Sequence, residues 1–86
     1  MVYNVIYKKS VHRDLQKLSK AEAVRILDRI EEELTSKSES NPVLKGRFRG
    51  FRRFRAGDYR VIYVLSGDDV LVLRIGHRSN VYKGEI

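Results

Sequence analysis

The sequence predicts an α+β fold in which one strand is followed by a two-helix antiparallel hairpin and a three-strand antiparallel meander. Three observations carry this prediction. β-Branched and aromatic residues cluster near the start and in the second half of the chain, which is typical of strands. Apolar residues recur at helical spacing between those two regions. Two glycine–aspartate pairs interrupt the second half, where they suit hairpin turns.

The first strand is expected at residues 2–7 (VYNVIY), because β-branched and aromatic side chains dominate this run. The pattern then changes. Val11, Leu15 and Leu18 recur at i, i+4 and i+7, which is the spacing of one helix face. Ser10 is the expected N-cap of this short first helix.

A second helix is predicted to begin at Ser19, because Ser19 and Glu22 have the spacing of a capping box. An apolar stripe gives this helix a face for the core. The stripe consists of Ala23, Ile26, Leu27, Ile30 and Leu34. Almost no linker separates the two helices, so we expect an antiparallel hairpin. Residues 35–42 (TSKSESNP) lack apolar periodicity and are typical of a loop.

The second half of the chain predicts three strands. Residues 51–56 and 59–65 flank Gly57-Asp58, a two-residue turn that suits a β-hairpin. A second turn at residues 66–69 precedes the last strand, expected at residues 70–75. We expect the helices to be packed on one face of an antiparallel sheet, since this layering hides both apolar stripes in so short a chain.

Length and composition limit the fold and its partners. A chain of 86 residues without repeats is predicted to form one domain, residues 1–86. It has no cysteine, so neither disulfides nor a thiolate metal site are expected, and its start lacks the pattern of a signal peptide. No apolar run approaches the roughly 20 residues of a membrane span. We expect a cytoplasmic protein with no metal, no small-molecule cofactor and no membrane partner.

The net charge of +7 indicates a polyanionic partner, either nucleic acid or an acidic protein. Residues 1–40 carry eight Lys or Arg against seven Asp or Glu, whereas residues 41–86 carry ten against four. Eight of those ten cations are arginine, whose planar guanidinium suits phosphate recognition. Solubilising surface charge is the competing interpretation.

Alternation along each strand assigns side chains to the two faces of the sheet. Phe54 and Ala56 are expected to face the helices, whereas Arg53 and Arg55 face away. Arg60 is placed on the same open face. In the last strand Arg74 and, further on, Arg78 are expected on the open side, and His77 on the core side. Leu71, Leu73 and Ile75 are expected together on the core side, with Val70 and Val72 on the side of Arg74.

These positions predict a basic surface on the open face of the sheet. Its arginines are Arg53, Arg55, Arg60, Arg74 and Arg78, with Tyr82 and Tyr59 as aromatic companions. Guanidinium groups pair with phosphates and aromatic rings stack on bases, so a few nucleotides of single-stranded RNA or DNA are the expected ligand. Neither helix is basic enough to enter a duplex groove.

Three segments resemble the RelE/ParE superfamily of toxin–antitoxin toxins. They are IGHRSNVY at residues 75–82, Leu44-Lys45-Gly46, and RFRAGDYRVIY at residues 53–63. The order of strand, two helices and three strands is similar as well, so the resemblance covers nearly the whole chain. The G-D-Y-R turn with the terminal H-R-x-x-V-Y is more similar to the RelE branch than to the ParE branch.

The resemblance implies a metal-independent, ribosome-dependent endoribonuclease that cuts messenger RNA in the A site. The ribose 2′-OH would attack the adjacent phosphate, giving a 2′,3′-cyclic phosphate and a free 5′-OH. Such a reaction needs a base for the 2′-OH, cations for the phosphorane and a proton donor for the departing oxygen.

The same resemblance assigns roles to residues. It implies that Arg60 stabilises transition-state charge, that Arg78 binds the phosphate and that Tyr82 stacks on or orients the nucleotide. Arg53 occupies a place where RelE-type toxins carry a catalytic lysine, and Arg55 lies on the same face. Arg74 and Lys45 complete the expected phosphate-binding set.

One part of the family pattern is missing. Phe51 and Arg53 stand where lysines are expected, and an arginine is a poor proton acceptor near neutral pH. His77 has a suitable intrinsic pKa for either proton role, although alternation favours packing against the core. Lys45 and Tyr82 are further candidates for the base.

The resemblance also implies an acidic antitoxin as partner, and the net charge of +7 independently favours one. For the RNase interpretation the other partners are the ribosome and mRNA. Two further interpretations stay open: a ParE-like gyrase poison, and a nucleic-acid or antitoxin-binding module that has lost catalysis.

Overall fold

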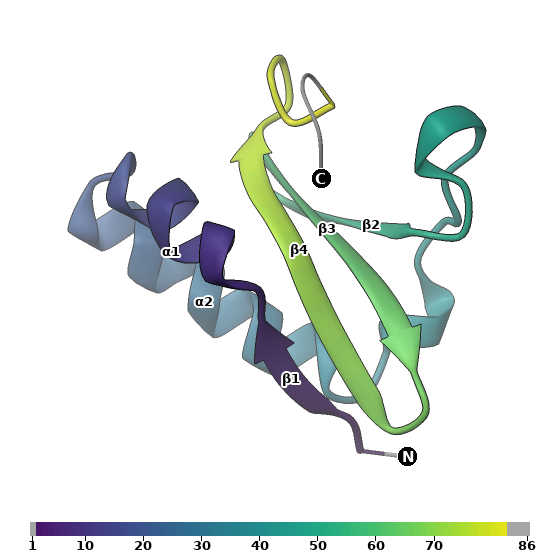
Figure 1. Cartoon of the computed structure of the whole chain (residues 1–86). Helices are drawn as coiled ribbons and strands as arrows, with labels where there is room; N and C mark the ends of the chain where they lie inside the picture. The colour runs from purple at the N-terminus through teal and green to yellow at the C-terminus, as the bar shows by residue number, and fades with distance from the viewer. Residues whose placement is uncertain (1, 83–86) are drawn as a thin grey trace.

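The computed structural model describes residues 2–82, which form a four-stranded sheet with two helices on one face (Figure 1). This confirms the predicted α+β architecture. Two short 3₁₀ turns lie between the helices and the second strand. The elements are β1 (Asn4–Tyr7), α1 (Lys9–Gln16), α2 (Lys20–Leu34), η1 (Ser38–Ser40), η2 (Gly46–Phe48), β2 (Arg52–Ala56), β3 (Tyr59–Ser66) and β4 (Asp69–His77).

The sheet has the order β1-β4-β3-β2 and is mixed. β2, β3 and β4 form the predicted antiparallel meander. The expectation of a wholly antiparallel sheet is wrong for β1, which pairs in parallel with β4. A parallel pair needs a long crossover connection. The helices and the strands that separate β1 from β4 in the chain provide it, and Figure 1 shows β1 beside β4.

The two helices run in opposite directions, as predicted, and α2 lies behind α1 in the view of Figure 1. The N-cap of α1 is Lys8 rather than the expected Ser10, and its side chain makes no capping bond. At α2 the Ser19 Oγ accepts a hydrogen bond from the Glu22 N–H at 3.2 Å. Neither helix of the described chain has the length and apolar character needed to cross a membrane.

The main core lies between the helices and one face of the sheet. Ile26, Ile30 and Leu34 of α2 contribute three of its buried side chains, as the apolar stripe predicts. Phe54 and Ala56 of β2 also face this core. The β2–β3 turn begins at Gly57, whose φ of 63° is a conformation that favours glycine.

The predicted faces of β4 are wrong for part of the strand. Val70 and Val72 lie in the core with Ile75, whereas Leu71 and Leu73 were expected there. The reason is an irregularity in the β3–β4 register: Ile62 pairs with Arg74 but Tyr63 pairs with Val72. One extra residue reverses the alternation of all residues beyond it.

Candidate nucleic-acid interface

The first strand of the hairpin and the C-terminal segment meet at Arg53 and Tyr82. The Arg53 guanidinium Nη1 donates to the Tyr82 hydroxyl at 3.4 Å, and both side chains are half-buried. The Tyr82 ring also contacts Phe48, with ring centroids 5.6 Å apart and planes tilted by 60°. The structure therefore brings together two of the predicted site residues. Phe48 was not predicted, although the alternation of Phe and Arg from residue 47 onward is the signal that could have indicated it.

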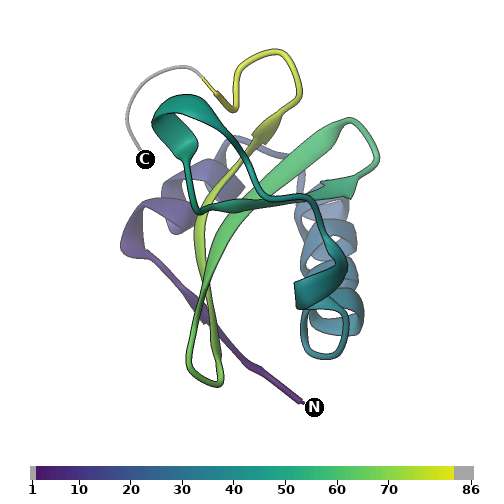
Figure 2. The ribbon, with the colours of Figure 1, turned by 90° about the vertical axis from the view of Figure 1, so that its right-hand side faces the viewer.

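The segment after β4 turns back toward the sheet. The N–H groups of Asn80 and Val81 both donate to the His77 carbonyl, at 2.8 and 2.9 Å. Val81 is fully buried. A Cβ placed on Gly76 would lie 3.3 Å from Val81, so the absence of a side chain at Gly76 lets this segment pack closely. Figure 2 shows the returning loop at the end of β4.

Arg60 is not exposed on an open face, contrary to expectation. Its exposed fraction is 8%, and its Nη1 donates to the carbonyls of Gly57 and Tyr59 at 2.9 and 3.1 Å. Its cross-strand partners are Arg55 on β2, which is exposed, and Gly76 on β4, which Val81 covers. This arrangement ties Arg60 to the backbone of the β2–β3 turn.

Arg78 is attached to that same turn. Its backbone N–H donates to the Asp58 carbonyl at 2.8 Å, and its Nε lies 4.0 Å from the Asp58 carboxylate. The Arg78 side chain is 64% exposed, so the guanidinium is available to a ligand. Asp58 was not predicted as a site residue, because its role follows from contact with the chain beyond β4.

His77 lies apart from the Arg53–Tyr82 contact. Its Nδ1 lies 2.8 Å from the Ser79 Oγ and accepts from the Ser79 N–H at 3.2 Å. Its ring meets that of Tyr59 edge-on, with centroids 5.6 Å apart. Tyr59 packs against the core, so His77 is on the side that alternation predicted. Its proposed role in proton transfer stays a prediction.

Arg74 lies in the same cross-strand row as Arg53, since both residues pair with Ile62 of β3, and directly paired residues share one face of the sheet. Arg74 also lines a cleft together with Asp14 of α1 and Lys17, the C-cap residue of that helix. Lys45 is exposed and immediately precedes η2. The register therefore places Arg53, Arg55, Arg60 and Arg74 on one face of the sheet, where Arg60 is buried.

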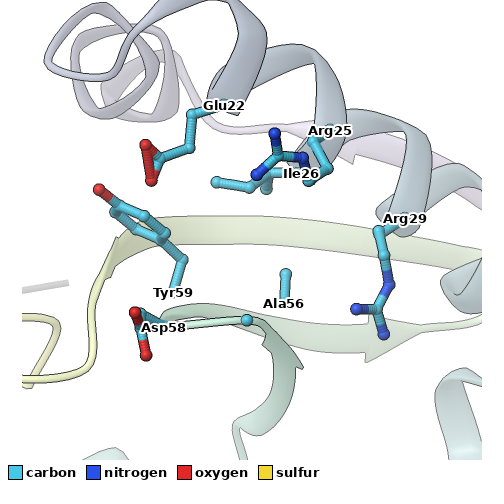
Figure 3. Close-up of a pocket in the computed structure, with 8 residues that line it drawn as sticks. Glu22, Arg25, Ile26, Arg29, Ala56, Asp58 and Tyr59 are labelled. Carbon is cyan, nitrogen blue, oxygen red and sulfur yellow. The ribbon is translucent and has the colours of Figure 1, made fainter.

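A hollow of mixed charge separates α2 from the hairpin (Figure 3). Glu22 and Tyr59 point toward one another there, and a hydrogen bond with Glu22 raises the pKa of Tyr59. Arg25 and Arg29 line the same hollow, and the Arg29 guanidinium lies 5.4 Å from the centre of the Phe54 ring. With two arginines near Glu22 and Asp58, this hollow is less suited to a polyanion than the Arg53–Tyr82 surface.

Comparison with known proteins assigns the fold and the family. The sequence matches the ParE toxin family of type II toxin–antitoxin systems, parDE, over residues 5–82. No curated protein sequence matches it. Among solved structures, the RelBE2 toxin–antitoxin complex from Mycobacterium tuberculosis is similar with a TM-score of 0.85 and 24% identity, covering 93% of this chain and 95% of that chain.

Two further structures represent both branches of the superfamily. The archaeal RelE–RelB complex from Pyrococcus horikoshii OT3 is 32% identical with a TM-score of 0.66, covering 94% of this chain and 100% of that chain. The chromosomal ParDE system from P. aeruginosa is 12% identical with a TM-score of 0.67, covering 88% and 96%. Because the family match spans nearly all described residues, this chain belongs to the ParE toxin family within the RelE/ParE superfamily and is a toxin of a type II toxin–antitoxin system.

Proposed function

We propose that this toxin is a RelE-like, ribosome-dependent endoribonuclease that cleaves mRNA in the A site and so inhibits translation. The observation that carries the proposal is the contact of Arg53 with Tyr82. It places a guanidinium for a phosphate beside an aromatic ring for a base, which is the pairing that single-stranded RNA needs. The 32% identity with the P. horikoshii RelE–RelB structure supports the RelE branch.

Each residue of the proposed site has its own role in the reaction. Arg53 and Arg78 are the cations that stabilise the phosphorane. Because Arg53 donates to the Tyr82 oxygen, the hydroxyl proton of Tyr82 is free to pass to the departing 5′-oxygen. Arg60 holds the β2–β3 turn to which Arg78 is attached. Arg55, which is exposed, binds a neighbouring phosphate.

The 2′-OH proton needs an acceptor as well. Within residues 2–82, no lysine, histidine or carboxylate forms a hydrogen bond or ion pair with Arg53 or Tyr82. The proposal therefore assigns this role to the complex with the ribosome, which would account for the dependence of cleavage on translation.

The proposed protein partner is an acidic antitoxin. The relatives from M. tuberculosis and P. horikoshii were solved as toxin–antitoxin complexes, and the net charge of +7 favours an acidic partner. Val24 on α2 and Ile6 on β1 are 48% and 47% exposed. They provide the apolar anchors that such an interface needs beside its charges.

The test is induced expression in living cells followed by primer extension on a translated message. Wild-type toxin should produce cuts in register with codons, and Arg53→Ala and Tyr82→Ala should each abolish them. Lys20→Ala, an exposed cation at the start of α2, is the matched control and should cut normally. Full cleavage by both site variants would refute the assignment.

A second candidate function is gyrase poisoning, favoured by the absence of a proton acceptor among the described contacts of this surface and by the ParE description of the family. A supercoiling assay separates the two. Inhibited supercoiling without codon-register cuts would support the ParE-like function.

A further inference from the structure

A second surface lies along the edge of β4, on the side of α1. β1 pairs with β4 only as far as Tyr7 and Val72. Beyond that point α1 takes the place of a strand, and Figure 1 shows it alongside β4. Two adjoining clefts of about 270 and 340 Å³ follow this boundary and share Asp14, Lys17 and Arg74 in their walls.

The larger of these clefts is strongly basic. Lys8, Arg13, Lys17 and Arg74 line it with Asp14 as the only carboxylate among its described lining residues. Arg13 of α1 and Lys17, its C-cap residue, are four positions apart and lie on the same side of this helix. The Asp14 Oδ2 already accepts a hydrogen bond from the Ile75 N–H at 3.0 Å. One of its two oxygens thus already has a backbone partner, and four cations line the same cleft.

The three cations that α1 and its two cap residues bring to this cleft are available to a ligand. Lys8, Arg13 and Lys17 are exposed. In the part of the chain that the structure describes, none of the three forms an ion pair. Like charges held close together without counter-charges repel one another, and a bound polyanion removes that repulsion.

We propose that this α1–β4 cleft, lined by Lys8, Arg13, Lys17 and Arg74, binds phosphates of a single-stranded RNA that continues past Ile62 from the Arg53–Tyr82 surface. β4 and β2 are two positions apart in the sheet, and Arg74 and Arg53 are the two cross-strand partners of Ile62. Their backbones are therefore roughly 10 Å apart on one face. The proposal rests on RNA as the ligand of the proposed function, but RNA binding in the cleft requires no cleavage.

RNA fits the cleft better than an acidic protein does. Protein interfaces need apolar anchors that become buried on binding. The large apolar side chains exposed in the described chain all lie outside the cleft, and Leu73 within it is already buried. Phosphate binding needs lysine and arginine side chains, and Lys8, Arg13 and Lys17 supply them here.

The test measures binding of a short, single-stranded, 2′-O-methylated RNA by fluorescence anisotropy over a range of salt concentrations. The probe lacks the attacking hydroxyl, so a toxin that cuts no mRNA would still give a clear result. Lys8→Gln/Arg13→Gln/Lys17→Gln removes the cations that α1 and its two cap residues bring to the cleft. Lys20→Gln/Arg25→Gln/Lys37→Gln is the control, which removes the same number of exposed lysines and arginines elsewhere.

The slope of log affinity against log salt should fall by about 2 in the cleft variant, since each lost contact with a single strand lowers it by about 0.7. At about 0.1 M salt this corresponds to a loss of affinity of roughly 100-fold. The control should keep the wild-type slope, and both variants should keep the wild-type melting temperature. An equal loss of RNA affinity in both variants would overturn the proposal, because the net charge of the protein would then explain the binding. Polyglutamate is added as a competitor at the same concentration of charge. If it displaces the RNA, and if this displacement also depends on the cleft lysines, an acidic protein is the ligand and the proposal is overturned.

Discussion

The carboxylate of Asp14 accepts a hydrogen bond from the backbone N–H of Ile75, at 3.0 Å and across 61 positions of sequence. β1 ends at Tyr7, so the part of β4 beyond Val72 has no neighbouring strand on that side. A buried N–H without a partner is costly. The Asp14 side chain on α1 therefore accepts the hydrogen bond that the backbone of a longer β1 would accept.

Replacing Asp14 by Ala should destabilise the protein by about 1–3 kcal/mol, because the N–H of the buried Ile75 loses its acceptor. Asp14→Asn keeps a side-chain carbonyl and should cost less. Urea unfolding measures both, with the exposed Arg13→Ala as a control expected to stay within about 0.5 kcal/mol of wild type. Equal stability of Asp14→Ala and wild type would show that this bond is unimportant.

Tyr63 connects β3 to the loop that precedes β2. Its hydroxyl donates to the Ser38 carbonyl at 2.5 Å and accepts from the Asn41 side-chain amide at 3.0 Å. Tyr63→Phe should lower the free energy of unfolding by about 1–3 kcal/mol. Tyr63 is fully buried, and loss of its hydroxyl leaves the Ser38 carbonyl and the Asn41 amide without their hydrogen-bond partner. Ser38→Ala is the matched control. The buried Ser38 Oγ has no hydrogen-bond partner among the described residues, so its removal should be neutral or stabilising.

The same tyrosine predicts a loss of stability in alkali. Burial raises the pKa of Tyr63 above its usual value of 10.0. In the unfolded chain the phenol ionises at about pH 10, whereas in the folded chain it stays protonated to higher pH. The contribution of Tyr63 to the free energy of unfolding is therefore complete below about pH 10 and is lost as pH rises through the pKa of the folded state. Unfolding free energies measured at increasing pH should fall less steeply for Tyr63→Phe than for wild type, and parallel curves would contradict this.

The sequence predicted the order of elements well because local signals specify it. Gly57-Asp58 and the strands on either side form the expected hairpin. The faces of β4 could not be predicted, since the register shift opposite Ile62 and Tyr63 depends on the neighbouring strand. Because of this one register shift, Val70 and Val72 lie in the core where Leu71 and Leu73 were expected.

The candidate site was predictable in part for a similar reason. Alternation places Arg53 on the side away from the core, and the position of Tyr82 just beyond the last strand predicted it nearby, where the structure has it in contact with Arg53. Alternation also placed Arg60 on that side, but it cannot show that Val81 returns over Gly76, the cross-strand partner of Arg60. Burial of Arg60 is thus a property of the C-terminal segment, and no local pattern contains it.

A substitution at Gly76 should displace the C-terminal segment that carries Val81 and Tyr82 without changing either of these residues. A Cβ at this position would lie 3.3 Å from Val81, so Gly76→Ala should displace Val81 and Tyr82 by a few tenths of an ångström. Gly76→Val should displace them further. We expect cleavage in a ribosome-dependent assay to decrease from wild type to Ala to Val, because small misplacements of reacting groups are costly. Wild-type activity in Gly76→Val would show that the position of Tyr82 is unimportant.

The two parts of the Tyr82 side chain can be separated by substitution. Tyr82→Phe keeps the ring that contacts Phe48 and loses the hydroxyl that contacts Arg53, whereas Tyr82→Ala loses both. If the hydroxyl donates the proton to the 5′-oxygen, Tyr82→Phe should lower the single-turnover cleavage rate on programmed ribosomes by about 100-fold or more while RNA binding is kept. Tyr82→Ala should in addition weaken RNA binding by about 1–3 kcal/mol, the worth of one stacked base. A Phe variant that cleaves at the wild-type rate would reduce the role of Tyr82 to stacking and would leave the proton donor to another group.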